Sequence, residues 1–272
     1  MIGLNPLQAL RTTTPYHISP YAPYSRLYLN ELYIDLDQLP EWHESEEAQQ
    51  QFLDPEFQAT LRALRQTCQV DYDAVATAKR TMLDLAYSTF ITEDYSGEEP
   101  HLQPNTERAR RLERFIQSEG TPLELYATFQ TLEEERRLIQ STSTTWHDWP
   151  KQFLMPGQPV REFAKRHRKR IRFFQYIQWV ASEQLNEIQR TAEQLAMPIG
   201  LYHDMALGAD RNGAEAWIYQ SVLALRADCG APPDSFAAAG QNWGLTPINP
   251  HAPRHSGSEL FILRVRSTFR TG

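Results

Sequence analysis

The chain has 272 residues and a mass of 31.5 kDa, a length that fits one large domain or two small ones. Hydrophobic residues make up 41% of it and charged residues 22%, which excludes a disordered or collagen-like chain. The formal net charge of −7 disfavours a general nucleic-acid binder, because phosphate contacts need a basic surface, and fits a neutral substrate better.

Targeting signals and cysteines bear on the compartment. No apolar run approaches the ~20 residues of a membrane-spanning helix. The first residues carry neither the charged region nor the apolar region of a signal peptide. Cys68 and Cys229 are too few for a disulfide framework and indicate a reducing compartment. We therefore expect a cytoplasmic protein that makes no membrane contact.

Residues 1–40 are rich in proline and tyrosine and poor in charge. The short apolar run Ile2–Leu4, stopped by an Asn-Pro pair, predicts the end of a buried strand. The proline-rich residues 15–24 predict an irregular loop. Residues 32–36 alternate weakly and predict a short extended segment.

Residues 41–165 predict a helical insertion subdomain, because no strand signal interrupts the helical pattern there or in the helix that follows. Apolar spacing predicts a helix over Asp71–Phe90, and Thr121 followed by Pro122 predicts a helix start. The longest helix is expected from about Val160 to Ala196. Its apolar stripe consists of Ile171, Phe174, Ile177, Ala181, Leu185, Ile188, Ala192 and Leu195.

Residues 166–272 return to a strand pattern after that long helix. Gly200–His203 predicts a short strand that is followed directly by Asp204. A carboxylate at the carboxyl end of a strand lies on the functional face of a (β/α)-type enzyme. A helix N-cap is the competing interpretation of Asp204, and its position alone does not separate the two. Residues 230–244 predict a long loop with an acid, an amide and an aromatic ring.

The loops at 15–24 and 240–244 combine aromatic faces with planar polar groups. Sugars need this combination, because their C–H faces stack on aromatic rings and their hydroxyls pair with amides and carboxylates. The alternative is a pair of surface loops with structural tyrosines, which composition alone favours.

Three other patterns are weaker. The basic run 166–170 resembles a nucleic-acid patch, but the apolar stripe continues on both sides of it and favours the solvated start of a helix. Arg226-Ala227-Asp228 is an Arg-x-Asp triplet of the kind found around glycosidase nucleophiles, but it lies between a helical stretch (216–225) and a turn, and we reject it. No metal-ligand spacing, glycine-rich phosphate loop or nucleophile elbow occurs, so we expect no metal and no cofactor.

Several multi-residue blocks recur in the order found in one enzyme family. They are Gly3–Leu10, Ser19-Pro20-Tyr21, Ser25–Asn30, Tyr33–Asp35, Val70–Val75 with Lys79, Trp146–Pro150, Phe174–Trp179, Gly200–Gly208, and Gly230–Phe236 with Gly240–Gly244. With these blocks the chain resembles the bacterial 4-α-glucanotransferases (amylomaltases, or disproportionating enzymes), glycoside hydrolase family seventy-seven. The resemblance covers nearly the whole chain and is weakest at 41–66 and 91–120.

The resemblance implies an α/β fold, part of a (β/α)8 TIM barrel with a large helical insertion. Residues 1–40 would hold barrel strand two and a substrate loop. Residues 166–272 would hold strand three, a second substrate loop and the helix before strand four. The family breaks an α-1,4 bond of a maltodextrin, holds the donor as a covalent β-glucosyl-enzyme, and passes it to the 4-hydroxyl of another glucan without a cofactor.

The resemblance also implies roles for individual residues. Tyr21 would line the donor site next to the scissile bond, and Asp204 would lie near the donor sugar. Gln241 and Trp243 would hold and stack glucose units on the acceptor side, and Asp234 would shape that loop or contact a sugar hydroxyl.

The catalytic pair of the family has no counterpart here. Its nucleophile, in an Arg-x-Asp-His motif, and its acid/base glutamate are expected beyond Gly272, so this chain is expected to supply sugar-binding residues only and, in isolation, not to transfer glucans. A non-catalytic maltodextrin-binding remnant is the alternative function, and a helical interaction protein that uses residues 166–170 is a third.

Overall fold

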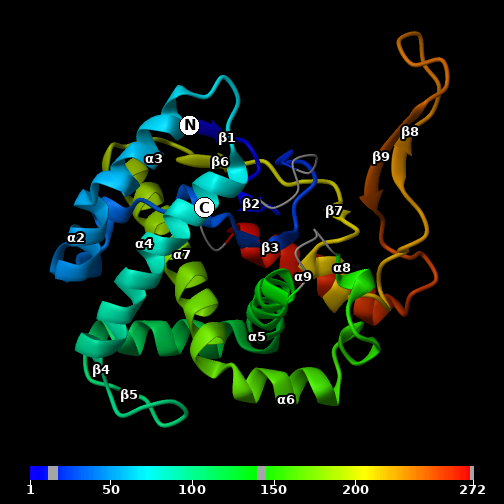
Figure 1. The fold of residues 1–272 in the computed structure, drawn as a ribbon. Coiled ribbons are helices and arrows are strands. Elements are labelled where there is room, and N and C mark those ends of the chain that lie inside the picture. The colour runs from blue at the N-terminus through cyan, green and yellow to red at the C-terminus, as the bar shows by residue number, and fades with distance from the viewer. Residues whose placement is uncertain (12–17, 140–144, 270–272) are drawn as a thin grey trace.

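The computed structural model describes residues 1–11, 18–139 and 145–269 (Figure 1). Its helices are α1 (Pro40–Glu44), α2 (Glu46–Leu53), α3 (Pro55–Gln66), α4 (Tyr72–Asp94), α5 (Glu107–Ile139), α6 (Gln158–Arg166), α7 (Arg168–Gln194), α8 (Ala214–Ile218) and α9 (Arg254–Phe269). Its strands are β1 (Ile2–Leu4), β2 (Gln8–Ala9), β3 (Ser25–Leu29), β4 (Tyr95–Ser96), β5 (Gln103–Pro104), β6 (Leu201–His203), β7 (Ala209–Asp210), β8 (Cys229–Ala231) and β9 (Gln241–Thr246). Part of the expected loop at 15–24 and the last three residues lie outside the described residues.

Strands β1 and β6 form a parallel pair, although 196 residues separate Leu4 from Leu201 (201 − 4 − 1). Ile2 lies opposite Leu201 and Leu4 opposite His203. Both strands were expected, but the burial of β1 was not predicted correctly, because Ile2 is 44% exposed and Leu4 is only half-buried. Within the described part of the chain, β1 is hydrogen-bonded to a neighbouring strand along only one of its two edges (Figure 1).

The helical layer is built around α4 and α5, which lie within the expected insertion, and α7, which lies beyond it (Figure 1). Helix α4 matches the predicted helix at 71–90, and the side chain of Asp71 caps it by accepting from the Ala74 amide at 3.0 Å. The predicted start at Thr121 also appears. Gly120 takes a left-handed φ of 59° and divides α5 into two helical stretches, the second beginning at Thr121-Pro122.

Three predictions of local structure were wrong. The long helix expected from 160 to 196 is interrupted at His167, whose φ and ψ (−108°, 26°) are not helical. Residues 32–36 do not form one extended segment, because they run from one 3-10 turn, Glu31–Tyr33, into another, Leu36–Gln38, and only Ile34 and Asp35 between the turns are extended. The helical region also contains the small β4–β5 hairpin, because Tyr95 packs its ring on Phe90 and pairs its backbone with Pro104.

Two clusters of buried side chains hold the helices and strands together. In the first, Phe90 on α4 contacts the rings of Tyr95, Tyr176 and Trp179. In the second, Trp217 on α8 contacts Phe129 of α5 and donates its indole N–H to the Phe153 carbonyl at 2.8 Å. The stripe predicted on α7 belongs to the first cluster up to Ala181. Leu185 and Ala192 are buried outside that cluster, and Ile188 and Leu195 are 52% and 67% exposed.

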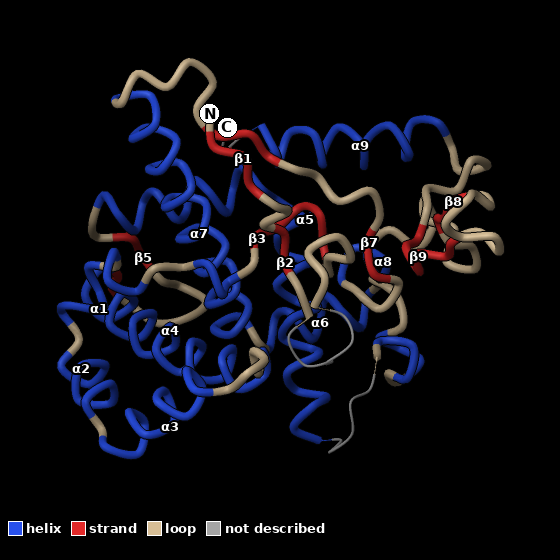
Figure 2. The backbone as a smooth tube through the Cα atoms, turned by 90° about the horizontal axis from the view of Figure 1, so that it is seen from above, coloured by secondary structure: helices blue, strands red, loops and turns tan. Residues whose placement is uncertain are grey.

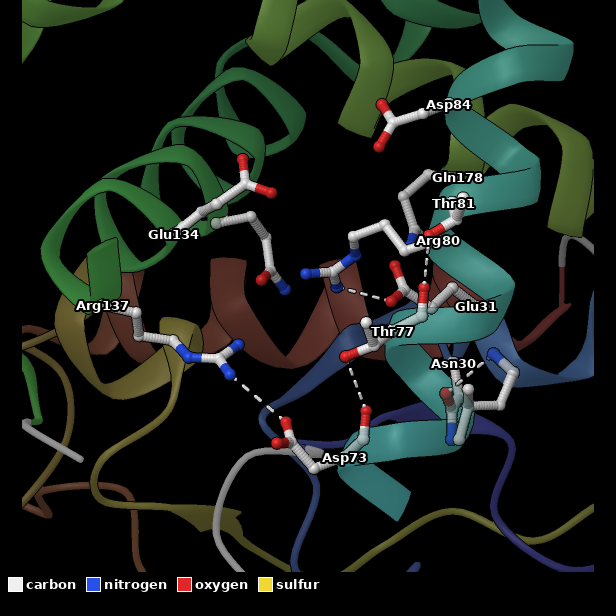
Figure 3. Close-up of polar contacts among 12 residues, drawn as sticks. Asn30, Glu31, Asp73, Thr77, Arg80, Thr81, Asp84, Glu134, Arg137 and Gln178 are labelled. Atoms are coloured by element: carbon white, nitrogen blue, oxygen red, sulfur yellow. Dashed lines mark hydrogen bonds and ion pairs between the residues drawn. The ribbon is translucent and has the colours of Figure 1, made fainter. Parts of the chain in front are cut away.

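Polar side chains connect the helices to one another and to the segment around β3. Arg137 on α5 reaches Asp73 of α4 at 3.2 Å, and Arg80 on α4 pairs with Glu31, which follows β3 (Figure 3). Gln178 on α7 accepts from the Leu29 amide at 2.8 Å and donates to the Leu29 carbonyl at 2.9 Å, so its amide group satisfies the backbone of β3. The contacts of Arg80 and Gln178 hold β3 and the residues that follow it against the helical layer.

We expect Phe90→Ala to lower the free energy of unfolding by about 3–5 kcal/mol, because the fully buried ring leaves a cavity among three aromatic neighbours. Phe236→Ala is the matched control, because the Phe236 side chain is 98% exposed. Urea unfolding of both variants measures the difference. Equal losses in the two variants would contradict the assigned core.

Candidate functional site

Asp204 lies at the carboxyl end of β6, as predicted. Its backbone amide donates to the Leu4 carbonyl at 3.2 Å, which extends the parallel pairing of β1 and β6 by one residue. The side chain is half-buried. The N-cap interpretation is wrong, because the residues after Asp204 lead into β7 and the next helix, α8, is capped by Gly213.

The segment expected as a long loop is a β-hairpin. Strands β8 and β9 pair antiparallel, and β9 also pairs with β7, so the hairpin continues from the segment that follows Asp204. Gly230 is required in β8, because a Cβ there would lie 2.0 Å from the Gln241 carbonyl oxygen. The hairpin projects from the body of the molecule in both views (Figures 1 and 2).

Gln241 and Trp243 lie together on β9. The Trp243 indole N–H donates to the Gln241 side-chain oxygen at 2.9 Å, and the Trp243 ring is 44% exposed. Their spacing of two residues puts both side chains on one face of the strand. The structure therefore presents one aromatic face beside one amide group.

Asp234 closes the turn between β8 and β9. Its Oδ1 accepts from the amides of Phe236 at 2.8 Å and Ala237 at 2.7 Å, so the carboxylate organises the turn. The rejected Arg226-Ala227-Asp228 triplet also serves the hairpin, because Asp228 accepts from Asn242 at 3.0 Å and from Arg211. The helical stretch expected at 216–225 is limited to α8, whose last residue is Ile218.

Tyr21 lies on the irregular segment before β3, with 49% of its side chain exposed. Tyr24, three residues later, is a structural tyrosine that is 1% exposed and hydrogen-bonds to Glu133. The segment is tied to its neighbours because the Asp210 amide of β7 donates to the Pro23 carbonyl at 2.9 Å.

Strand β7 pairs with β9 and hydrogen-bonds to the segment of Tyr21 at Pro23, but side-chain contacts join only some of the five predicted residues. Gln241 contacts Trp243, and Asp234 lies on the same hairpin. In the part of the chain that the structure describes, no hydrogen bond joins the Tyr21 or Asp204 side chain to the hairpin. The described residues also contain no group of three His, Cys, Asp or Glu side chains that could hold a metal ion, and no helix that could span a membrane.

A buried charge cluster behind the site was not predicted. Glu215 on α8 is fully buried between Arg26 of β3, at 2.6 Å, and Arg264 of α9, at 2.5 Å. Arg26 also donates to the Leu207 carbonyl at 2.6 Å, on the segment that follows Asp204. The available signal was an arginine inside an apolar strand, Ser25–Leu29, and a glutamate inside an apolar helix, Ala214–Ile218.

The two arginines control the ionisation of Glu215. Burial alone would raise its pKa, but Arg26 and Arg264 outweigh burial and lower the pKa to about 2. The carboxylate therefore stays charged and holds β3, α8 and α9 together.

These features define an α/β protein with a carboxylate at the carboxyl end of a parallel strand, a position at which such proteins bind ligands, and with an exposed aromatic ring and an amide on an antiparallel hairpin further along the chain. The sequence profile of the 4-alpha-glucanotransferases, glycoside hydrolase family seventy-seven, matches residues 1–271, and the chain belongs to this family.

Individual relatives agree with the profile. The chain is 32% identical over 265 residues to a 4-alpha-glucanotransferase of Haemophilus influenzae, covering 96% of this chain and 37% of that protein. It is 30% identical over 262 residues to a 4-alpha-glucanotransferase of Mycobacterium tuberculosis, covering 91% of this chain and 32% of that one. The chain thus spans about a third of the length of these curated relatives.

Solved structures share the fold. An amylomaltase from Corynebacterium glutamicum superposes with a TM-score of 0.72 at 26% identity, covering 99% of this chain and 34% of that one. An amylomaltase from Streptococcus agalactiae in complex with acarbose gives a TM-score of 0.72 at 20% identity, covering 99% of this chain and 50% of that one, and is similar in fold alone.

The Glu215 cluster predicts a pH dependence. Because its pKa is lowered in the folded state, its contribution is present above the unfolded value of about 4.5 and is lost as the pH falls toward 2. The loss is about 3 kcal/mol across that interval. Urea unfolding between pH 5 and pH 3 measures about 2 kcal/mol of this loss.

Glu215→Gln removes this part of the pH dependence and lowers stability at pH 7, because two buried guanidinium groups lose their counter-charge. Glu187→Gln, at an exposed position, is the control and keeps the profile of the unsubstituted chain. An unchanged profile in Glu215→Gln would contradict the assigned cluster.

Proposed function

We propose that this chain forms part of the glucan-binding region of a 4-alpha-glucanotransferase whose substrates are maltooligosaccharides. The observation that carries the proposal is the arrangement at the carboxyl end of the β1–β6 pair. Asp204 follows β6 directly, and β7 connects that end to the hairpin with Gln241 and Trp243. An exposed aromatic ring beside an amide on the hairpin, together with a carboxylate at the end of the strand that precedes it, suits a neutral sugar chain.

The same pair supports a barrel assignment. β1 and β6 are strands two and three of a (β/α)8 barrel, and α7 is the helix between them. Their parallel register and the long helical connection support this, because parallel neighbours in a sheet need a crossover. Residues 1–40 then carry strand two and a substrate loop, residues 41–165 the helical insertion, and residues 166–272 strand three, the hairpin and the helix before strand four.

The proposed reaction is a retaining double displacement. A carboxylate attacks the anomeric carbon of an α-1,4 bond, and an acid protonates the departing 4-oxygen. A second glucan then donates its 4-hydroxyl proton to the conjugate base while its oxygen displaces the enzyme carboxylate. Transfer exceeds hydrolysis when the acceptor sugar excludes water from the site.

We assign sugar-binding roles only within this chain. Tyr21 lines the donor side near the scissile bond, and Asp204 lies near the donor sugar. Gln241 and Trp243 hold acceptor glucose units, and Asp234 keeps the hairpin turn in shape. The exposure of Tyr21 and Trp243 and the turn bonds of Asp234 support these roles. We propose that the enzyme is cytoplasmic and needs no cofactor. The two free cysteines agree with a reducing compartment.

We expect the isolated chain of 272 residues not to transfer glucans, because retention needs two carboxyl groups about 5–5.5 Å apart and we assign neither to this chain. Incubation with maltotriose and measurement of released glucose tests this. Glucose release that disappears in Asp204→Ala would contradict the assignment.

We expect Trp243→Ala to weaken the binding of maltoheptaose about tenfold, because stacking on an aromatic face is worth roughly 1 kcal/mol or more. Phe261→Ala is the control, because it removes another exposed ring, 53% exposed, from α9. Calorimetric titration compares the two. Undetectable binding to the folded, unsubstituted chain would reject the proposed function and the maltodextrin-binding alternative alike.

A further inference from the structure

A surface hollow lies between α4 and the junction of α6 with α7, far from the β1–β6 pair. Its volume is about 520 Å³, within the usual range for small-molecule sites of roughly 300–1,000 Å³. One wall is a single face of α4 that includes Asp84, Ser88 and Thr92, at helical spacings of four residues. The other wall is the basic junction that contains Arg166 and Lys169.

Side-chain contacts hold the walls in place. Arg170 on α7 hydrogen-bonds to Asp84 on α4 and to Glu134 on α5, the latter at 2.5 Å. Figure 3 shows that these two carboxylates come from different helices. The Tyr87 hydroxyl donates to the Lys169 carbonyl at 3.4 Å. Arg170 also lies 4.0 Å from the centre of the Phe173 ring. The hollow is therefore pre-formed, and the charge of Arg170 is used to build it.

Two further cationic side chains on the junction wall, Arg166 and Lys169, have no ion-pair partner among the described residues. Both side chains line the hollow and are exposed. The carboxylate that faces them, Asp84, is paired with Arg170. A chain with a net charge of −7 thus carries a local excess of positive charge inside this hollow.

The α4 wall supplies neutral polar groups. Ser88 and Thr92 are exposed, and the Thr92 hydroxyl donates to the Ser88 carbonyl at 2.9 Å, which leaves its oxygen oriented as an acceptor. The floor is apolar, because the rings of Tyr87 and Phe173 are 4% and 1% exposed. Cations on one side, hydroxyls on the other and rings beneath suit a ligand that has both an anionic group and several hydroxyls.

We propose that this hollow binds a sugar phosphate monoester. Arg166 and Lys169 hold the phosphate through charge-assisted hydrogen bonds, and Ser88 and Thr92 contact the sugar hydroxyls. The site is separate from the proposed glucan site, because the 27 residues of α7 place its first turn about 40 Å from the turn that leads to β6. The chain then has a binding site for a phosphorylated sugar that is independent of its glucan-binding region.

The test is calorimetric titration of the full 272-residue chain with glucose 6-phosphate, inorganic phosphate and glucose. We expect glucose 6-phosphate to bind about tenfold more tightly than inorganic phosphate, because the hydroxyl contacts add to the ionic ones, and glucose not to bind. Equal affinity for phosphate and glucose 6-phosphate would overturn the assignment to a sugar phosphate. No binding of either anion would overturn the site itself.

Charge-matched variants locate the binding. The double variant Arg166→Gln/Lys169→Gln is expected to weaken glucose 6-phosphate binding about tenfold or more, because both charge-assisted contacts are lost. Lys165→Gln/Arg168→Gln removes the same charge from exposed neighbours outside the hollow and is expected to change binding less than about twofold, as for screened surface charges. Equal losses in the two variants would mean general electrostatic attraction and would overturn the proposal.

Maltoheptaose binding is measured in parallel on both variants, where it should stay unchanged. Ser88→Ala/Thr92→Ala should reduce the preference for glucose 6-phosphate over phosphate and leave phosphate binding intact. A preference that survives in this variant would overturn the role given to the hydroxyls.

Discussion

The buried Arg26–Glu215–Arg264 cluster is the interaction on which the arrangement of the candidate site depends. Glu215 is removed from water entirely, which would be unfavourable for a lone carboxylate, and two guanidinium groups supply the missing hydrogen bonds. The three residues come from β3, α8 and α9, so one ion cluster fixes elements that lie nearly 240 residues apart along the chain (264 − 26 = 238). Because Arg26 also binds the Leu207 carbonyl, the position of the segment after Asp204 follows from the same cluster.

The helical layer depends on α7 in a comparable way. One face of this helix fills the aromatic core, while Gln178, Gln184 and Gln189 bind backbone groups of Leu29, Asp35 and Leu201. A glutamine amide carries one donor and one acceptor group, as a peptide unit does. In a region with very short strands, these side chains supply hydrogen bonds that a neighbouring strand would supply in a larger sheet.

Local patterns were sufficient for α4, for the second stretch of α5 and for the strand before Asp204. Asp71 and Thr121-Pro122 are start signals that act within one turn, so the sequence alone locates the helices they begin. The break at His167 was not predictable from periodicity, because the apolar spacing continues across it and the interruption arises where two helices pack on different neighbours.

Some features of the candidate site also follow from local sequence, whereas others depend on contacts between distant segments. Asp204, Gln241 and Trp243 could be named from residue type and order, but the hairpin that carries two of them depends on pairing among β7, β8 and β9. Arg226-Ala227-Asp228 has the composition of a catalytic motif, yet its aspartate holds Asn242 and Arg211. The Glu215 cluster needs contacts between distant elements, and no local pattern contains them. The positive charge at 166–170 was visible in the sequence, whereas the hollow that gives it a shape was not.

The glutamine contacts of α7 have a consequence for how the chain reaches this structure. Leu29 and Asp35 are each bound by a side chain 149 residues further along. Long-range contacts of this kind raise the contact order, and the entropy of closing so large a loop opposes folding before the contacts form. We therefore expect the segment from β3 to the second 3-10 turn to reach its final conformation only after α7 has formed and docked.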